Sequence, residues 1–176
     1  MVSYCGWFRT FTIHMSLHNL VKLNFPEAEL KIRQLESTAE IFDPLRKRYV
    51  RLTAEEWVRQ HLINYFHHHL GVPVHMMASE RGLIINKLQK RFDLVIYHPG
   101  GYPLLIAECK APTVKLGEDT FYQAAGYNFA LKVKFLMITN GIEHHCVLVE
   151  EKSGQIRFLE AIPDYDFMKR YCTDNA

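Results

Sequence analysis

The hydrophobic pattern of this 176-residue chain changes its period once, and this change restricts the folds open to it. Between residues 53 and 70 the apolar side chains recur every three or four positions, as on one face of a helix. Those side chains are Trp57, Val58, Leu62, Tyr65 and Phe66. After Gly71 and Pro73, which end such a helix, apolar residues come in short runs typical of strands. The sequence therefore predicts a helix followed by a sheet.

The start of this helix is also marked. Thr53 is a good N-cap because its hydroxyl can accept a backbone N–H of the first turn, and Glu56 stands three residues later. Together the two residues form a capping box. This pattern predicts a structural role for Glu56, which competes with any role in chemistry.

The later part of the chain alternates short apolar runs with turns. The predicted strands are 82–86, 92–97, 104–110, 135–139, 146–149 and 156–159. Residues 118–131 contain no proline and are interpreted as a helix between the third and fourth strands. Three meandering strands, a crossover helix and further strands predict a mixed α/β (α+β) fold, in which helices flank a mixed β-sheet.

The composition argues against a disulfide-rich scaffold and a membrane-spanning protein. Hydrophobic residues make up 48% of the chain and charged residues 23%, which is ordinary for one soluble globular domain. A net charge of +2 is compatible with a polyanionic partner without demanding one. The four cysteines form no CxxC pair and fit a reducing compartment. No apolar run reaches the ~18 residues of a membrane span, so together with the cysteine pattern we expect a cytoplasmic protein with no membrane partner.

Charged residues interrupt two of the predicted strands. Asp93 lies within the strand at 92–97, and Glu108 and Lys110 lie near the end of the strand at 104–110. Residues i and i+2 of a strand share a face, so Glu108 and Lys110 should be neighbours. The turn at 98–103 lets the two strands pair, which would bring Asp93 close to Glu108. Two carboxylates suit Mg²⁺, and an adjacent lysine can orient a water for phosphodiester hydrolysis.

This metal-site interpretation competes with a simpler one. An ExK triplet arises by chance on the order of once in a chain of this length, and a lone Asp at a strand end is often solvated or salt-bridged. Gln123 and Tyr127 share a face of the predicted 118–131 helix, where they could meet a nucleotide. Taken alone, they are better explained by a surface glutamine and a core tyrosine.

Combined, these motifs resemble a known family. Asp93, Glu108-Cys109-Lys110 and Gln123-Ala-Ala-Gly-Tyr127 match a D…ExK…QxxxY pattern. The pattern resembles that of the N-terminal nuclease domain of type I restriction enzyme R subunits and of related RecB-like nucleases. Flanking segments that strengthen the resemblance are KIRQ at 31–34, IFDPLRKRYV at 41–50, LTAEEWVRQH at 52–61, KRFDLVIY at 90–97, LLIAECKAP at 104–112 and TNG at 139–141.

The resemblance implies a PD-(D/E)xK, restriction-endonuclease-like core. It covers roughly residues 22–165, which we expect to form one nuclease domain. Residues 1–21 are then expected to be a poorly ordered extension, and residues 166–176 a C-terminal tail.

The resemblance also implies roles for individual residues. Asp93 and Glu108 would hold Mg²⁺, with Mn²⁺ as a substitute, and Lys110 would serve the attacking water. Gln123 and Tyr127 would help to place DNA or the lysine. Family members often carry a further acidic residue upstream, for which the sequence offers two candidates. These candidates are Glu80 as a metal ligand and Glu56 as a supporting residue.

DNA is the expected partner, together with other restriction or DNA-processing subunits. Lys90, Arg91 and Lys115 are the candidate contacts to its phosphates. The sequence contains no GxxxxGK[ST] phosphate loop, so we do not expect this chain to translocate DNA by itself. Two functions remain open: a metal-dependent deoxyribonuclease, and a non-catalytic nucleic-acid-binding or accessory module that keeps the nuclease fold.

Overall fold

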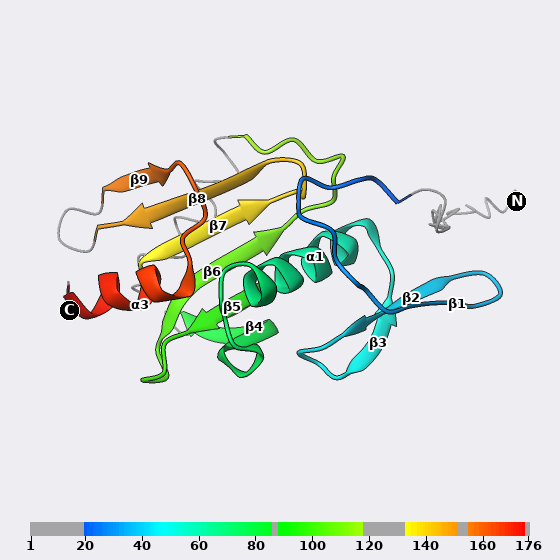
Figure 1. Cartoon of the computed structure of the whole chain (residues 1–176), viewed down its shortest axis with the longest axis horizontal. Coiled ribbons are helices and arrows are strands. Elements are labelled where there is room, and N and C mark those ends of the chain that lie inside the picture. Colours follow the sequence, from blue (N-terminus) through cyan, green and yellow to red (C-terminus); the bar gives the residue numbers. More distant parts are fainter. Residues whose placement is uncertain (1–19, 86–87, 118–132, 151–154, 175–176) are drawn as a thin grey trace, which may run out of the picture.

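The computed structural model describes residues 20–85, 88–117, 133–150 and 155–174, and it contains two sheets (Figure 1). The small sheet has three antiparallel strands, β1 (Ile32–Gln34), β2 (Ala39–Asp43) and β3 (Arg48–Arg51). The large sheet has six, β4 (Met77–Ile85), β5 (Leu88–Tyr97), β6 (Pro103–Cys109), β7 (Phe135–Thr139), β8 (His144–Val149) and β9 (Ile156–Leu159). The helical elements are α1 (Ala54–His68), the short 3-10 helix η2 (Val74–Met76) and α3 (Tyr165–Asp174).

The large sheet is mixed, as the sequence predicts. Its strands are ordered β4-β5-β6-β7-β8-β9, and only β6 and β7 run parallel. A parallel pair needs a crossover connection, which here leaves the sheet after β6 and returns at β7. The helix predicted at 118–131 lies within this connection and outside the described residues. The predicted mixed α+β fold is confirmed.

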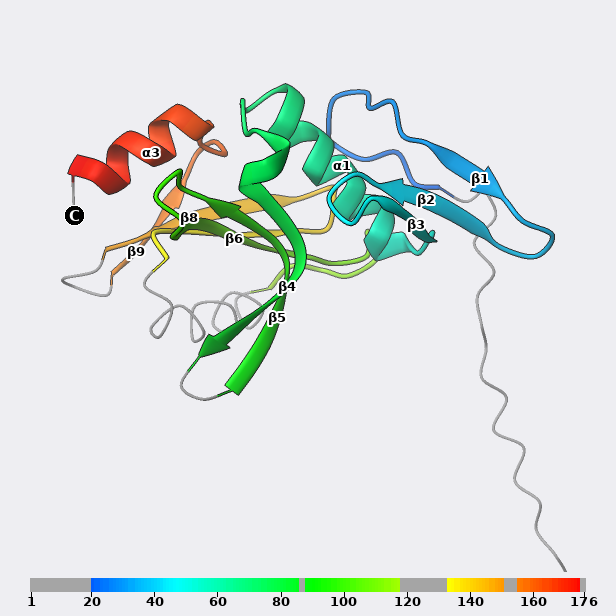
Figure 2. The same cartoon turned by 90° about the horizontal axis from the view of Figure 1, so that it is seen from below.

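Helices α1 and α3 lie on the same face of the large sheet (Figures 1 and 2). The main core forms between them and the sheet, where α1 contributes Leu62 and Phe66 and α3 contributes Met168 and Cys172. The opposite face of the sheet carries a second, smaller apolar cluster around Val95 and Val147. Burial on both faces explains why the strands at 92–97, 104–110 and 135–139 are nearly continuous apolar runs.

The N-terminal end of α1 is capped as the sequence predicts. The hydroxyl of Thr53 accepts a hydrogen bond from the backbone N–H of Glu56 at 3.0 Å. This bond satisfies one of the free donors of the first turn. The predicted helix start is therefore confirmed.

Two elements were not predicted. The small sheet lies beside α1, on the side of the molecule away from α3, and its own core contains Ala39, Ile41 and Leu52 packed near Trp57 (Figures 1 and 2). Helix α3 occupies most of the segment expected to be a tail, and Met168 and Cys172 bury its inner face. Both elements therefore belong to the packed body of the protein.

Candidate active site

Three carboxylates stand in one row across neighbouring strands of the large sheet. Glu80 on β4 lies opposite Asp93 on β5, because the pairs Ser79↔Leu94 and Arg81↔Phe92 flank that position. Asp93 is in turn next to Glu108 on β6, because the adjacent pair is Leu94↔Ala107. The prediction that Asp93 and Glu108 lie on adjacent strands is confirmed.

The carboxylate of Asp93 is held by two groups. Its Oδ1 pairs with the Arg59 guanidinium at 2.7 Å, and its Oδ2 accepts a hydrogen bond from the backbone N–H of Cys109 at 2.7 Å. Arg59 comes from helix α1, so this ion pair joins the helix to the sheet at the carboxylate row. Only 4% of the Arg59 side chain is exposed, and the residue was not singled out in the sequence.

Glu108 and Lys110 form the neighbouring pair that the i, i+2 spacing predicts. Lys110 Nζ lies 2.7 Å from Glu108 Oε1, and about one-third of each side chain is exposed. Burial and the charge of Asp93 raise the pKa of Glu108 above its ordinary value, despite the neighbouring lysine. Burial lowers the pKa of Lys110, but the bond to Glu108 outweighs burial and raises the pKa overall, so Lys110 stays protonated.

Glu55 is a further acidic residue of the site, and sequence reasoning missed it. It lies in the first turn of α1, where its carboxylate is 3.1 Å from Arg59. Burial, followed by the charge of Asp93, raises the pKa of Glu55. The i, i+4 spacing of Glu55 and Arg59 was the signal that could have revealed their shared face.

Glu56 and Glu80 are bound to arginines. The buried Glu56 carboxylate lies 2.7 Å from Arg46 and 2.6 Å from Arg59. Glu80 lies 2.9 Å from Arg46 and 3.5 Å from Arg59. The backbone of Glu80 has a φ of 48°, a left-handed conformation that is uncommon for residues other than glycine and is often found at functional sites.

Arg46 connects this cluster to the small sheet. Its Nε lies 2.5 Å from the fully buried Asp43 at the end of β2. Burial raises the pKa of Asp43, but hydrogen bonds from the backbone and side chain of Arg46 outweigh burial and lower the pKa overall. The ion pairs therefore run without interruption from Asp43 through Arg46, Glu56 and Arg59 to the carboxylate row.

The whole cluster carries an excess of negative charge. It contains six carboxylates, from Asp43, Glu55, Glu56, Glu80, Asp93 and Glu108. It contains only three cations, from Arg46, Arg59 and Lys110. Among the described residues, no three or more His, Cys, Asp or Glu side chains are grouped to hold a metal ion. Mg²⁺ usually takes one or two protein carboxylates and keeps several waters, so Asp93 and Glu108 fit it.

The other predicted residues are not brought together by the described structure. Gln123 and Tyr127 lie outside the described residues, as does the side chain of Lys90. Arg91 is exposed on β5, and Lys115 is exposed in the loop after β6. Their contacts to DNA stay predictions.

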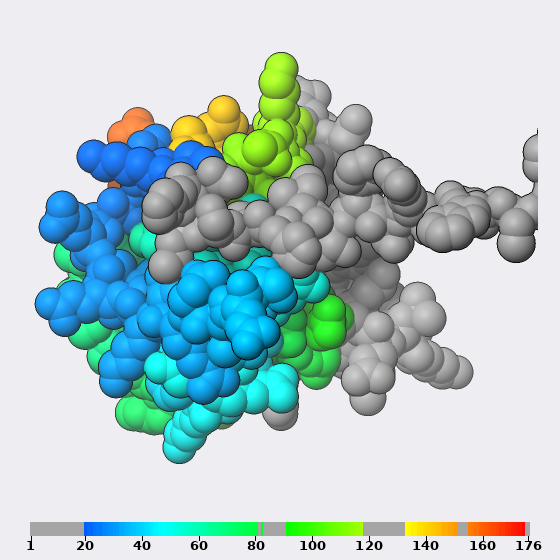
Figure 3. Space-filling view, turned by 90° about the vertical axis from the view of Figure 1, so that its right-hand side faces the viewer, coloured from blue at the N-terminus to red at the C-terminus, as the bar shows by residue number. Residues whose placement is uncertain are grey.

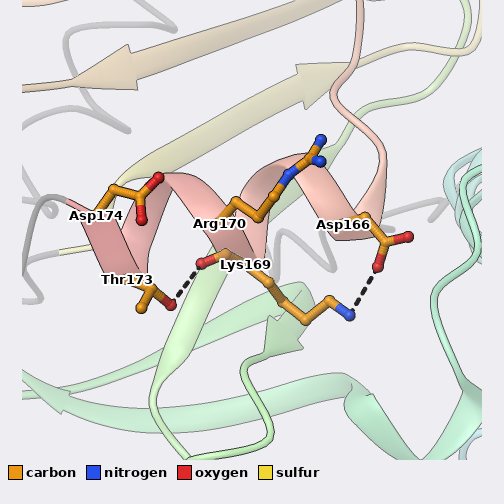
Figure 4. A pocket seen from close by; sticks show the side chains of 5 residues that line it. All are labelled: Asp166, Lys169, Arg170, Thr173 and Asp174. Carbon is orange, nitrogen blue, oxygen red and sulfur yellow. Dashed lines mark hydrogen bonds and ion pairs between the residues drawn. The ribbon is translucent and has the colours of Figure 1, made fainter.

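A pocket on helix α3 is separate from the carboxylate row (Figure 4). Its lining residues are Asp166, Lys169, Arg170, Thr173 and Asp174. Lys169 pairs with Asp166 at 2.7 Å, within the same helix. No residue of the carboxylate row lines this pocket, so it does not contribute to the candidate site.

Comparisons with known proteins identify the family. A family model described as the N terminus of the type I restriction enzyme R protein matches residues 54–163. The chain belongs to this family. The matched range contains the carboxylate row together with Glu55, Arg59 and Lys110, and the resemblance seen in the sequence is thus confirmed.

Comparison of this chain with solved structures gave matches, one of which is a fragment of a chain assigned as an HsdR subunit of a type I restriction enzyme from Vibrio vulnificus YJ016. The two are 25% identical with a TM-score of 0.39, over 56% of this chain and 21% of that one. This chain therefore spans about a fifth of that fragment. A comparison with curated proteins gave no match. Within the described residues of this type I R-protein family member, no helix is long and apolar enough to cross a membrane.

Proposed function

We propose that this R-subunit-like domain is a Mg²⁺-dependent deoxyribonuclease that hydrolyses phosphodiester bonds by attack of water. The observation that carries the proposal is the placement of Asp93 and Glu108 on two paired strands, with Lys110 beside Glu108 directly after the second strand. The excess of carboxylates around them favours binding of a divalent cation, since each unpaired anion in a half-buried site raises the free energy of its neighbours.

Each residue would have a distinct task. Asp93 and Glu108 would hold Mg²⁺, which when bound would polarise the phosphate and activate a water. Protonated Lys110 lies beside Glu108 and could donate hydrogen bonds to the attacking water or to a phosphate oxygen. Arg59 and the Cys109 N–H orient the Asp93 carboxylate through its two oxygens. Glu55, beside Arg59, is a further candidate for binding the cation through water.

A second function is favoured by one observation. Both oxygens of Asp93 already have partners in Arg59 and the Cys109 N–H, and a carboxylate so satisfied needs no metal. A non-catalytic module that binds nucleic acid, alone or with other restriction subunits, would fit this state. The two functions differ in whether phosphodiester bonds are broken.

The deciding experiment is a cleavage assay. Purified protein is incubated with plasmid, linear and single-stranded DNA in Mg²⁺, Mn²⁺ or EDTA, beside a matched Lys110→Ala preparation. We expect cleavage that requires the metal and is greatly reduced in the variant. DNA left intact under every metal condition would contradict the nuclease and support the module. Equal cleavage by both preparations would exclude the proposed role of Lys110.

A further inference from the structure

The outer face of the small sheet combines cations with aromatic rings. The face is formed by Lys31, Arg33, Glu40, Phe42, Tyr49 and Arg51. Arg33 lies over the ring of Tyr49 at 4.1 Å, and Lys31 lies 5.8 Å from the ring centre of Phe42. The two rings meet edge to face at 5.3 Å. These contacts show that the side chains share one side of the sheet.

The same face is positively charged. Lys31, Arg33 and Arg51 are exposed on it, and Lys47 is exposed at the adjoining β2–β3 turn. Glu40 is the one carboxylate of the face, and Arg33 pairs with it at 2.5 Å. The opposite, inner side carries the apolar residues Ala39 and Ile41 and the buried Asp43, and it packs near α1. The outer side therefore has no part in the core. In Figure 3 the blue and cyan atoms of this region form much of the surface turned to the viewer.

We propose that this outer face is a docking surface for the sugar-phosphate backbone of double-stranded DNA. The chemistry fits because exposed cations spread over one face of the sheet can contact successive phosphates, and the release of counterions supplies binding energy. Aromatic rings beneath the cations hold them in place without neutralising them. The inference rests on the proposed function in one respect, that DNA is the substrate.

The small sheet is also rigidly joined to the candidate active site. Asp43, on the inner side of β2, pairs with Arg46, which pairs with Glu56 of α1 and Glu80 of β4. Ser79 of β4 donates a further hydrogen bond to Asp43 at 3.1 Å. DNA held on the outer face would therefore keep a fixed position relative to Asp93 and Glu108.

The test measures DNA binding without metal, so that cleavage plays no part. A 30-base-pair duplex is titrated in EDTA against the wild type, Lys31→Gln/Arg51→Gln, and the control Arg157→Gln/Arg170→Gln. The control removes the same charge from exposed residues of β9 and α3, at the other end of the molecule (Figures 1 and 2). We expect the first double variant to lose at least about tenfold in affinity. The slope of its affinity against salt concentration should also fall by the amount that about two phosphate contacts contribute. The control should bind like the wild type.

Three outcomes would overturn the inference: no binding by the wild type, equal binding by the first double variant, or an equal loss in both double variants. A loss confined to the first variant supports it, even if the cleavage assay shows no nuclease. Conversely, if cleavage requires metal and Lys31→Gln/Arg51→Gln binds DNA with unchanged affinity, the nuclease proposal is supported and the docking surface is refuted. Unchanged thermal unfolding of the variants verifies that they are folded.

Discussion

The guanidinium of Arg59 on helix α1 lies 2.7 Å from Oδ1 of Asp93 on strand β5. The same guanidinium lies 2.6 Å from the buried carboxylate of Glu56. One buried cation therefore forms ion pairs with a carboxylate of the candidate site and with a carboxylate of the helix that packs on it. Removing the cation would leave both anions in a region of low dielectric constant.

We therefore expect Arg59→Ala to lower the free energy of unfolding by about 3–5 kcal/mol, the usual effect of breaking a buried ion pair on one side. Urea denaturation at neutral pH measures it. Arg33→Ala is the matched control, since its partner Glu40 is on the surface and about half of the Arg33 side chain is exposed. The control should change stability by about 1 kcal/mol or less. Equal losses for both variants would show that burial of Arg59 has no special effect.

The raised pKa of Glu108 predicts a pH-dependent stability. A raised pKa means that the folded protein binds the proton of the Glu108 carboxyl more tightly than the unfolded chain does. This proton therefore stabilises the fold fully below the unfolded pKa of about 4.3, and its contribution is lost as pH rises through the folded pKa. Glu108→Gln cannot ionise. In EDTA it should melt at a higher temperature than the wild type at pH 7–8, and this advantage should shrink toward pH 4.

Thermal unfolding across this pH range checks the expectation, with the exposed Glu29→Gln as a control that should show no such trend. A constant difference between Glu108→Gln and the wild type at every pH would contradict it. Added Mg²⁺ should stabilise the wild type more than the variant, because a ligand that binds only the folded state raises its melting temperature.

Lys110 and Glu108 should differ in their effects on metal binding. Glu108→Ala removes an anionic ligand and should weaken Mg²⁺ binding. Lys110→Ala should keep the metal or bind it more tightly, because the variant frees Glu108 from its 2.7 Å ion pair. Cleavage by Lys110→Ala should still fall by roughly 10²–10³-fold, the usual effect of losing one charge-stabilising donor. Calorimetric Mg²⁺ titration beside the cleavage assay separates the two roles. Loss of Mg²⁺ binding in Lys110→Ala would contradict the separate roles assigned to Glu108 and Lys110.

The turn after β7 depends on Gly141. Its φ is 83°, and a Cβ added there would lie 2.8 Å from Cδ2 of Leu23. We expect Gly141→Ala to destabilise the fold by about 1–3 kcal/mol, because an L side chain in this backbone conformation is strained and also meets Leu23. Gly117→Ala is a suitable control, since a Cβ there meets nothing within 4 Å. Chemical denaturation of the two variants compares them. A smaller loss at Gly141 than at Gly117 would contradict this account.

The parts of the fold that were predictable have local causes. Thr53 caps the helix three residues before Glu56, and a short turn joins the strands that carry Asp93 and Glu108. The small sheet was missed because its strands are short and carry the aromatic residues Phe42 and Tyr49 on their outer face, which weakens the alternation of polar and apolar residues. Helix α3 was missed because few of its side chains are buried, among them Met168 and Cys172.

The sequence by itself determined that Asp93, Glu108 and Lys110 would meet, because period-2 strands joined by a short turn leave few other pairings. It also contained the pattern that marks the type I R-protein family. Only the tertiary structure decided that Arg59 pairs with Asp93, 34 residues further along the chain, and that Arg46 joins the small sheet to Glu56 and Glu80. Such contacts follow no local periodicity. They depend on how α1 packs between the two sheets. A buried arginine without a partner would cost free energy, so each one pairs with a carboxylate.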